Sequence, residues 1–523
     1  MRYQIGLSLV LLFGIEAIVI AASQKAIPSS VKSKIDMITT KVEQKLIRSD
    51  QAWKQLKAVK PKGLASGGSY FRQAQAQFFY YHQLPFLAAL YAADALKFSP
   101  IPTDPKFRRS WAILYQVSQN YPIQYLLESL ASHSRLSTST PPHFGNNWHY
   151  IIANAYQNLG WDKKALSQYR KLNVGDRYFL PGLYQSALIS HELNETEKAL
   201  EDLDALINEE SYHISPLSLE KKAELRDYAH LAKARILYES GDFSRSVKSY
   251  RNVSRNSAVF YEALFEQAWA LFLSGNPQHA LGSLYGVNSP FFKNRFNPEI
   301  RVLEAIIYYW LCRYQDSRQA LASFAKFDSK TVEKLRDFLN QQRLSSEKAY
   351  QLFENHILGV SSEALGVPRS VLETVATRDS MLLYRDQYAA LLEEKQRFEL
   401  ADFVDEDSRT GIEAKLGDQI QKLRDLVGNQ YLEELKSLKD QFDELYAQSE
   451  FLYVELMMSE KEKLLGRVLH ADTKITKISE AKNIKGWVGR GQSWEAKYDE
   501  FWWDEVGFHI VNVSPLCQLN SLE

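Results

Sequence analysis

Small and apolar residues recur at a regular spacing in the middle of the chain. Ala153 is followed, at offsets of 3, 7, 12 and 16, by Tyr156, Gly160, Ala165 and Tyr169. Most of this series returns from four later alanines, Ala187, Ala234, Ala268 and Ala305, and a degenerate copy starts at Ala76. The five full copies are 34, 47, 34 and 37 residues apart. An interval near 34 predicts pairs of helices that stack along the chain.

The residue types within one copy fit this prediction. A small residue in each helix, such as Ala153 and Ala165, lets the two helices approach closely, and Gly160 supplies the turn between them. One pair cannot bury its apolar face alone, so neighbouring pairs must stack. An irregular helical bundle with a coincidental alanine spacing is the alternative.

The copies resemble tetratricopeptide repeats (TPRs), and the resemblance covers residues 147–325. It implies an all-α fold in which a TPR-like α-solenoid presents a concave groove that holds protein. The aromatic side chains expected there suit an apolar helix or an extended segment, and their packing between repeats is the alternative. Carried onto this sequence, the groove residues are Tyr150, Asn154, Gln157, Tyr184, His191, Arg235, Tyr238, Phe265, Trp269, Phe272 and Tyr309.

A long helix is predicted further along, because residues 412–464 contain no proline and have apolar residues mostly three and four positions apart. We call this series of residues the first seam: Leu416, Ile420, Leu423, Val427, Tyr431, Leu435, Leu438, Phe442, Leu445, Leu452 and Leu456. A rod of this kind must pair with another helix. We expect an antiparallel hairpin with Met381–Phe398, and homodimerisation through the seam is the alternative.

The C-terminal end is rich in aromatic residues, with Trp487, Trp494, Trp502 and Trp503 close together. Exposing so many large rings is unfavourable, so we expect this tail to dock on the rest of the chain. A position along the repeats near Phe265–Tyr309 would bring Cys517 toward Cys312. These are the only two cysteines, and they permit one disulfide, although two buried thiols are the interpretation we slightly prefer.

Residues 1–23 have the layout of a secretory signal: a cation at Arg2, an apolar run from Ile5 to Ala22, and small residues at the end. We therefore expect a periplasmic or otherwise extracytoplasmic protein. An uncleaved N-terminal anchor and a buried N-terminal helix are the alternatives, because the run of 18 residues is nearly long enough to span a bilayer.

Composition narrows the class of function. Lys and Arg total 63, as do Asp and Glu, and this zero net charge argues against a partner that is nucleic acid. The 23 glycines and 16 prolines are few for 523 residues, which favours long helices. The sequence contains no clustered metal ligands, no phosphate-binding loop for a nucleotide, and none of the hydrolase motifs GxSxG, HExxH or SxxK, so we expect no cofactor.

Together these features predict a signal segment (1–23), an N-terminal helical region (24–145), the solenoid (146–330), long helices (331–470) and a Trp-rich tail (471–523). The function that fits best is a non-catalytic scaffold of the bacterial cell envelope that binds other envelope proteins through its groove and coiled coil. Cell-wall glycan or peptidoglycan binding by the tail tryptophans is the alternative, and an enzyme with an unrecognised site is less favoured.

Overall fold

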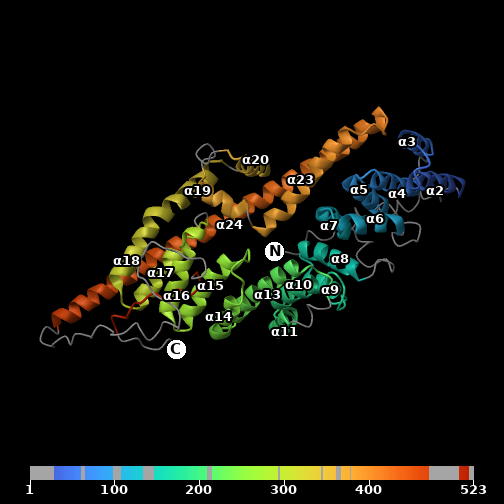
Figure 1. Ribbon diagram of the computed structural model, residues 1–523. Coiled ribbons are helices and arrows are strands. Elements are labelled where there is room, and N and C mark those ends of the chain that lie inside the picture. Colours follow the sequence, from blue (N-terminus) through green and yellow to red (C-terminus); the bar gives the residue numbers. More distant parts are fainter. Residues whose placement is uncertain are drawn as a thin grey trace, which may run out of the picture. The chain divides into compact units, whose positions relative to one another are not determined.

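The computed structural model describes residues 29–59, 65–97, 108–132, 146–208, 215–292, 295–342, 345–360, 367–376, 378–469 and 506–517. Within these residues every regular element is a helix, as the all-α prediction requires (Figure 1). The expected signal segment and the four tail tryptophans lie outside the described residues.

The chain divides into two compact units. Unit 1 comprises Met1–Leu225, Ser345–Gln351 and Thr377–Tyr431, and unit 2 comprises the remaining segments. The division falls inside α13 (Leu219–Glu239), so the expected single domain over 146–330 is split. It also assigns Thr377–Tyr431 to the N-terminal unit, because residues of this segment pack on the N-terminal helices.

The helices that lie wholly in unit 1 are α2 (Ser29–Glu43), α3 (Ser49–Ala58), α4 (Ala65–Tyr81), α5 (Pro85–Lys97), α6 (Arg108–Ser118), α7 (Gln124–Ala131), α8 (Asn147–Asn158), α9 (Asp162–Tyr169), α10 (Phe179–Glu192), α11 (Thr196–Ile207) and α23 (Asp379–Glu399). Those wholly in unit 2 are α14 (Phe243–Arg251), α15 (Phe260–Leu273), α16 (Pro277–Val287), η2 (Pro290–Phe292), α17 (Glu299–Trp310), α18 (Tyr314–Ser323), η3 (Phe324–Asp328), α19 (Ser329–Gln342) and α22 (Arg369–Ala376). Besides α13, the helices α20 (Ser346–Ile357) and α24 (Glu406–Leu469) contribute residues to both units.

The predicted helix pairs are present, and their small residues are buried. Ala153 of α8 and Ala165 of α9 are both fully buried, as are the residues at the same two positions in the other copies. Two copies have serine in the second position. Ser246 Oγ donates a hydrogen bond to the Ala234 carbonyl, and Ser317 Oγ donates to the Ala305 carbonyl, each at 2.8 Å. The hydroxyl is thereby satisfied, and serine can replace alanine without leaving a buried polar group unpaired.

The turn inside each pair has one shared backbone geometry. The residue at offset 7 adopts a left-handed conformation, with φ between 57° and 80° at Gly160, Asn194, Gly241, Gly275 and Cys312. The N–H of the next residue then bonds back to a carbonyl five residues earlier, as from Trp161 to Tyr156 and from Arg313 to Tyr308, each at 2.9 Å. This closing bond is that of a Schellman motif.

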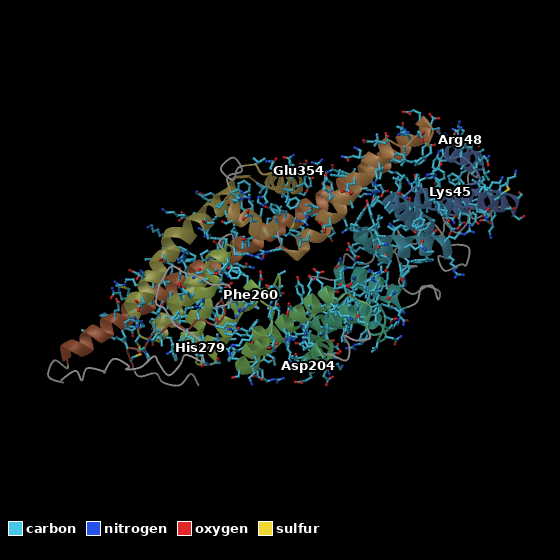
Figure 2. All side chains as sticks on the ribbon, viewed as in Figure 1. Lys45, Arg48, Asp204, Phe260, His279 and Glu354 are labelled. Atoms are coloured by element: carbon cyan, nitrogen blue, oxygen red, sulfur yellow. A yellow bond between two sulfur atoms is a disulfide. The ribbon has the colours of Figure 1, made fainter. Side chains whose placement is uncertain are left out.

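The same turn extends the pattern toward the N-terminus. Gln83, at offset 7 from Ala76, has φ 58°, and the next N–H bonds to the Phe79 carbonyl at 3.0 Å. Lys45, labelled in Figure 2, occupies the equivalent turn between α2 and α3, with φ 54°. The sequence shows only a degenerate copy at Ala76 and none before it, because neither turn contains the expected glycine.

In unit 1, helix α23 is joined to the N-terminal helices by buried hydrogen bonds. The carboxylate of Glu394 accepts the backbone N–H groups of Phe86 and Leu87, both at 2.7 Å, in the first turn of α5. Two helical turns earlier, Gln387 Oε1 accepts the N–H of Tyr125 at 3.0 Å in the first turn of α7. Residues seven apart share one helix face, so α23 caps two helix N-termini at once.

Burial has a further effect on Glu394, whose side chain is fully enclosed. The loss of solvation raises the pKa of Glu394 to about 7, although the two N–H donors oppose the shift.

The connector that follows α23 is fixed to α3 by an ion pair. Lys57 Nζ lies 2.7 Å from Asp405 Oδ1, and this hydrogen bond is the main cause that lowers the pKa of Asp405 to about 2.

In unit 2, residues 506–517 form an extended segment, which we call the strap, on α15, α16 and the end of α17. Val506 is fully buried in the core of this unit. The Val511 N–H bonds to the Gln278 carbonyl at 3.1 Å, and the Leu516 N–H bonds to the Leu311 carbonyl at 2.9 Å. The strap therefore packs on the helices over Phe265–Tyr309, where the sequence predicts that the tail docks. Docking of the tryptophans themselves stays a prediction, because they lie outside the described residues.

The strap ends in a disulfide between Cys517 and Cys312, with the Cα atoms 5.8 Å apart. The slight preference for two buried thiols was therefore wrong, because docking of the strap brings the two cysteines together. Close backbone approach is possible because α16 has glycine beneath the strap. A Cβ atom on Gly282 would lie 1.8 Å from the His509 carbonyl oxygen.

Candidate partner-binding surface

The eleven predicted groove residues fall in both units, so we describe them as two groups. Five lie on α8 and α10 of unit 1: Tyr150, Asn154, Gln157, Tyr184 and His191. Six lie on α13, α15 and α17 of unit 2: Arg235, Tyr238, Phe265, Trp269, Phe272 and Tyr309.

The unit 1 group is centred on a layer of hydrogen-bonded tyrosines and amides. The Tyr169 hydroxyl donates to Asn154 Oδ1 and lies 2.8 Å from Gln157 Oε1. Gln157 in turn donates to Gln185 Oε1 at 3.1 Å. Asn154 and Gln157 thus bond to side chains of α9 and α10, and this part of the predicted surface is largely used in joining neighbouring helices.

Aromatic stacking extends the same layer. The Tyr150 ring stacks on that of Tyr178, with centroids 4.6 Å apart and planes 5° from parallel. Burial raises the pKa of both phenols, so they stay neutral hydrogen-bonding groups. Tyr184 and His191 are half-buried, and His191 Nδ1 lies 3.4 Å from Thr196 Oγ1.

Two residues of the unit 2 group do not belong to the candidate surface. Phe265 and Phe272 are buried in the hydrophobic core of this unit, where Phe272 makes an edge contact with the Trp310 ring. The packing alternative is therefore the right one for both. Tyr309 is half-buried, and its hydroxyl lies 3.0 Å from Ser459 Oγ, so it packs on α24.

The other three residues form a partly exposed cluster that we call the Trp269 patch: Arg235, Tyr238 and Trp269, with Glu266 and Glu299. Arg235 forms a two-pronged ion pair with Glu266, at 2.8 and 2.6 Å. The Trp269 indole N–H donates to Glu299 Oε1 at 2.8 Å. These bonds fix the guanidinium and the indole before any partner arrives.

The electrostatics of the patch follow from partial burial. Burial raises the pKa of Glu299, and the Trp269 hydrogen bond acts against that rise. Burial also raises the pKa of Tyr238, helped by the nearby charge of Glu299. Sequence reasoning named the arginine, tyrosine and tryptophan but missed both glutamates. They lie on the same first helices of the pairs, and a search for charged residues facing the aromatic ones could have found them.

Candidate metal ligands do not cluster in the described ranges. These ranges contain no group of three or more His, Cys, Asp or Glu residues placed to hold a metal ion. Among the described helices, none combines the length and the apolar character that a membrane span needs.

No protein-family model fits the chain, and no curated protein matches it. The TPR resemblance therefore stays a prediction from the repeat spacing.

Proposed function

We propose that the chain is a non-catalytic, TPR-like scaffold of the bacterial cell envelope that binds other proteins through the first helices of its helix pairs. The observation that carries this proposal is the Trp269 patch. Arg, Tyr and Trp are the residues most enriched at the energetic centres of protein interfaces. Here the arginine and the tryptophan are already held in place by Glu266 and Glu299, so a partner would lose little entropy by ordering them.

The extracytoplasmic location is supported by two features. The N-terminal segment has the pattern of a secretory signal. The Cys312–Cys517 bond is of a kind that forms and persists in oxidising compartments.

We also propose that α23 and the start of α24 pair as an antiparallel hairpin. This pairing is supported by Arg409 of α24, which donates a hydrogen bond to the Glu399 carbonyl, at the end of α23, at 3.1 Å.

Site-specific photo-crosslinking in the producing cells tests the proposal. A benzophenone side chain at position 238 should capture a defined protein, whereas the same group at Lys248, exposed on the second helix α14, should not. The captured protein is then purified and its affinity measured. Trp269→Ala should weaken binding by about 30-fold, the effect of losing about 2 kcal/mol.

Trp269→Phe keeps a six-membered aromatic ring but loses the five-membered ring with its N–H, so it should weaken binding less than Trp269→Ala. Melting curves must show that each variant is folded. Equal capture from positions 238 and 248, or unchanged binding by Trp269→Ala, would refute the proposed role of the patch.

A further inference from the structure

The part of α24 that lies in unit 2 exposes a second series of large apolar residues. Phe451, Val454, Met458 and Leu465 have exposed fractions of 68%, 54%, 55% and 49%. Together with Ala447 and Lys461 they occupy every third or fourth position from 447 to 465, which we call the second seam. The spacing is that of the contact positions in a coiled coil.

The opposite face of the same helix is already packed. Leu452 and Leu456 are buried against Ala305, Ala320 and Leu321 of α17 and α18. Arg318 of α18 also pairs with Glu460. The exposed side chains of the second seam are not part of this packing, and a row of exposed apolar side chains such as Phe451, Val454 and Met458 is typical of an interaction site.

The charges beside the seam decide which kind of helix fits. Glu450 flanks it on one side, and Glu455 and Glu462 flank it on the other. A second copy in parallel would place Glu450 opposite Glu455 of the other chain. An antiparallel copy would place the two Glu455 side chains near each other. Both arrangements bring like charges together, so self-association is disfavoured.

We propose that the second seam binds one amphipathic helix of a partner protein whose apolar residues are flanked by Lys and Arg. The seam spans about 27 Å, since each helical residue adds about 1.5 Å, so the partner helix needs about five turns. Met458 and the neighbouring exposed Met457 provide flexible side chains that adapt to the apolar residues of a partner. This inference rests on the proposed scaffold function but uses a different surface from the Trp269 patch.

Two synthetic peptides test the charge requirement. Both carry the same apolar heptads over five turns, one flanked by Lys and Arg and the other by Glu, and each is titrated into the full chain by calorimetry. The basic peptide should bind at least about tenfold more tightly than the acidic one, and its affinity should fall as salt is added. Reversing all three flanking charges, with Glu450→Lys, Glu455→Lys and Glu462→Lys, should reverse this preference.

Substitution of the seam tests the location. The double variant Phe451→Ser and Met458→Ser should weaken binding of the basic peptide by at least about tenfold. The control is Leu400→Ser, the same kind of apolar-to-serine change at a highly exposed leucine outside the seam, which should leave the affinity unchanged. Both variants change exposed side chains, and melting curves check that they fold.

Three results would overturn the inference: no binding of the basic peptide, equal binding of both peptides, or a wild-type dimer in sedimentation equilibrium that Phe451→Ser dissociates. The last would make a second copy the occupant. Failure here is distinguishable from failure of the proposed function, because crosslinking from position 238 uses neither the peptides nor the seam.

Discussion

The two units are built from the same kind of helix pair but fix the returning C-terminal part of the chain by different chemistry. In unit 1, α23 is fixed by hydrogen bonds, with Glu394 and Gln387 capping α5 and α7. In unit 2, the strap is fixed by the Cys312–Cys517 bond and by close backbone packing on α16. Unit 1 should therefore respond to pH at this contact, and unit 2 to reducing agents.

The largest expected effect is loss of the disulfide. The bond joins residues 205 positions apart, and the chain-entropy model gives a loop of this size about 5 kcal/mol of stability. Cys517→Ser should therefore lower the free energy of unfolding of unit 2. Amide hydrogen exchange should become faster in the strap and in α15–α18 and stay unchanged in α4–α7.

A second variant, at Cys312, separates the stability lost with the disulfide from the effect of backbone strain at that residue. Cys312 adopts a left-handed conformation with φ 57°, which glycine tolerates better. Cys312→Gly should therefore lose about 1 kcal/mol less than Cys517→Ser. Equal acceleration of exchange in both units would contradict the assignment of this bond to unit 2 alone.

The second effect is a pH dependence in unit 1. The pKa of Glu394 is raised to about 7 from an ordinary value of 4.5, so the folded state favours the neutral acid. This contribution is complete below about pH 4.5 and is lost as the pH rises through about 7, a change on the order of 3 kcal/mol. Exchange protection in α5 should therefore increase between pH 8 and pH 5 after correction for the intrinsic rates.

Glu394→Gln should flatten that profile in unit 1. The control is Glu304→Gln in unit 2, where burial also raises the pKa of the carboxyl to about 7. Glu304→Gln should alter the pH dependence of α17 and leave that of α5 unchanged. An unaltered α5 profile in Glu394→Gln would show that another group is responsible.

The third effect is a loss of stability when the close packing between α16 and the strap is disturbed. Gly282→Ala places a Cβ atom against the His509 carbonyl, and backbone on both sides leaves little room to adjust. We expect a loss of about 2 kcal/mol, in the range of other overpacked sites. In hydrogen exchange, the Val511 N–H should lose protection although the disulfide remains intact. Unchanged protection would mean that α16 and the strap can separate without cost.

The smallest expected effect is a gain in the stability of unit 1. Gly417 lies within α24 in unit 1, and a Cβ atom there would meet nothing within 4 Å. Gly417→Ala should therefore stabilise unit 1 by about 1 kcal/mol through helix propensity, measured as a higher denaturation midpoint. Gly428→Ala on the same helix is the contrasting variant and should destabilise, because its Cβ atom would lie 2.0 Å from the Ser346 carbonyl oxygen.

Local features of the fold could be predicted from the sequence. The turn positions follow from the repeat spacing because glycine and asparagine adopt the left-handed conformation most easily. The buried alanines follow because helix pairs need small residues where they approach. Both features depend on residues close together in the chain.

Contacts between distant segments could not be predicted in the same way. The residues that cap α5 and α7 lie about 260 to 310 positions further along the chain, and nothing near Phe86 or Tyr125 indicates them. The prediction that Phe265 and Phe272 face the groove was wrong for a related reason. Helix α15 is apolar on nearly every face, so its sequence does not show which face its neighbours cover.

The second seam was missed because two apolar series overlap on one helix. The first seam accounts for the residues buried within the chain, such as Leu452 and Leu456. Phe451 and Val454 lie beside them in sequence and are exposed. Only the burial of one series distinguishes it from the other.

The covalent link between Cys312 and Cys517 also determines how the protein would carry mechanical tension. A pull applied beyond residue 517 passes through the sulfur atoms directly to the α17–α18 turn. The intervening residues, which include α23 and α24, are then bypassed by the force. In an oxidised molecule tethered at both termini, those helices would be shielded from stretching, and reduction would bring them under the full force.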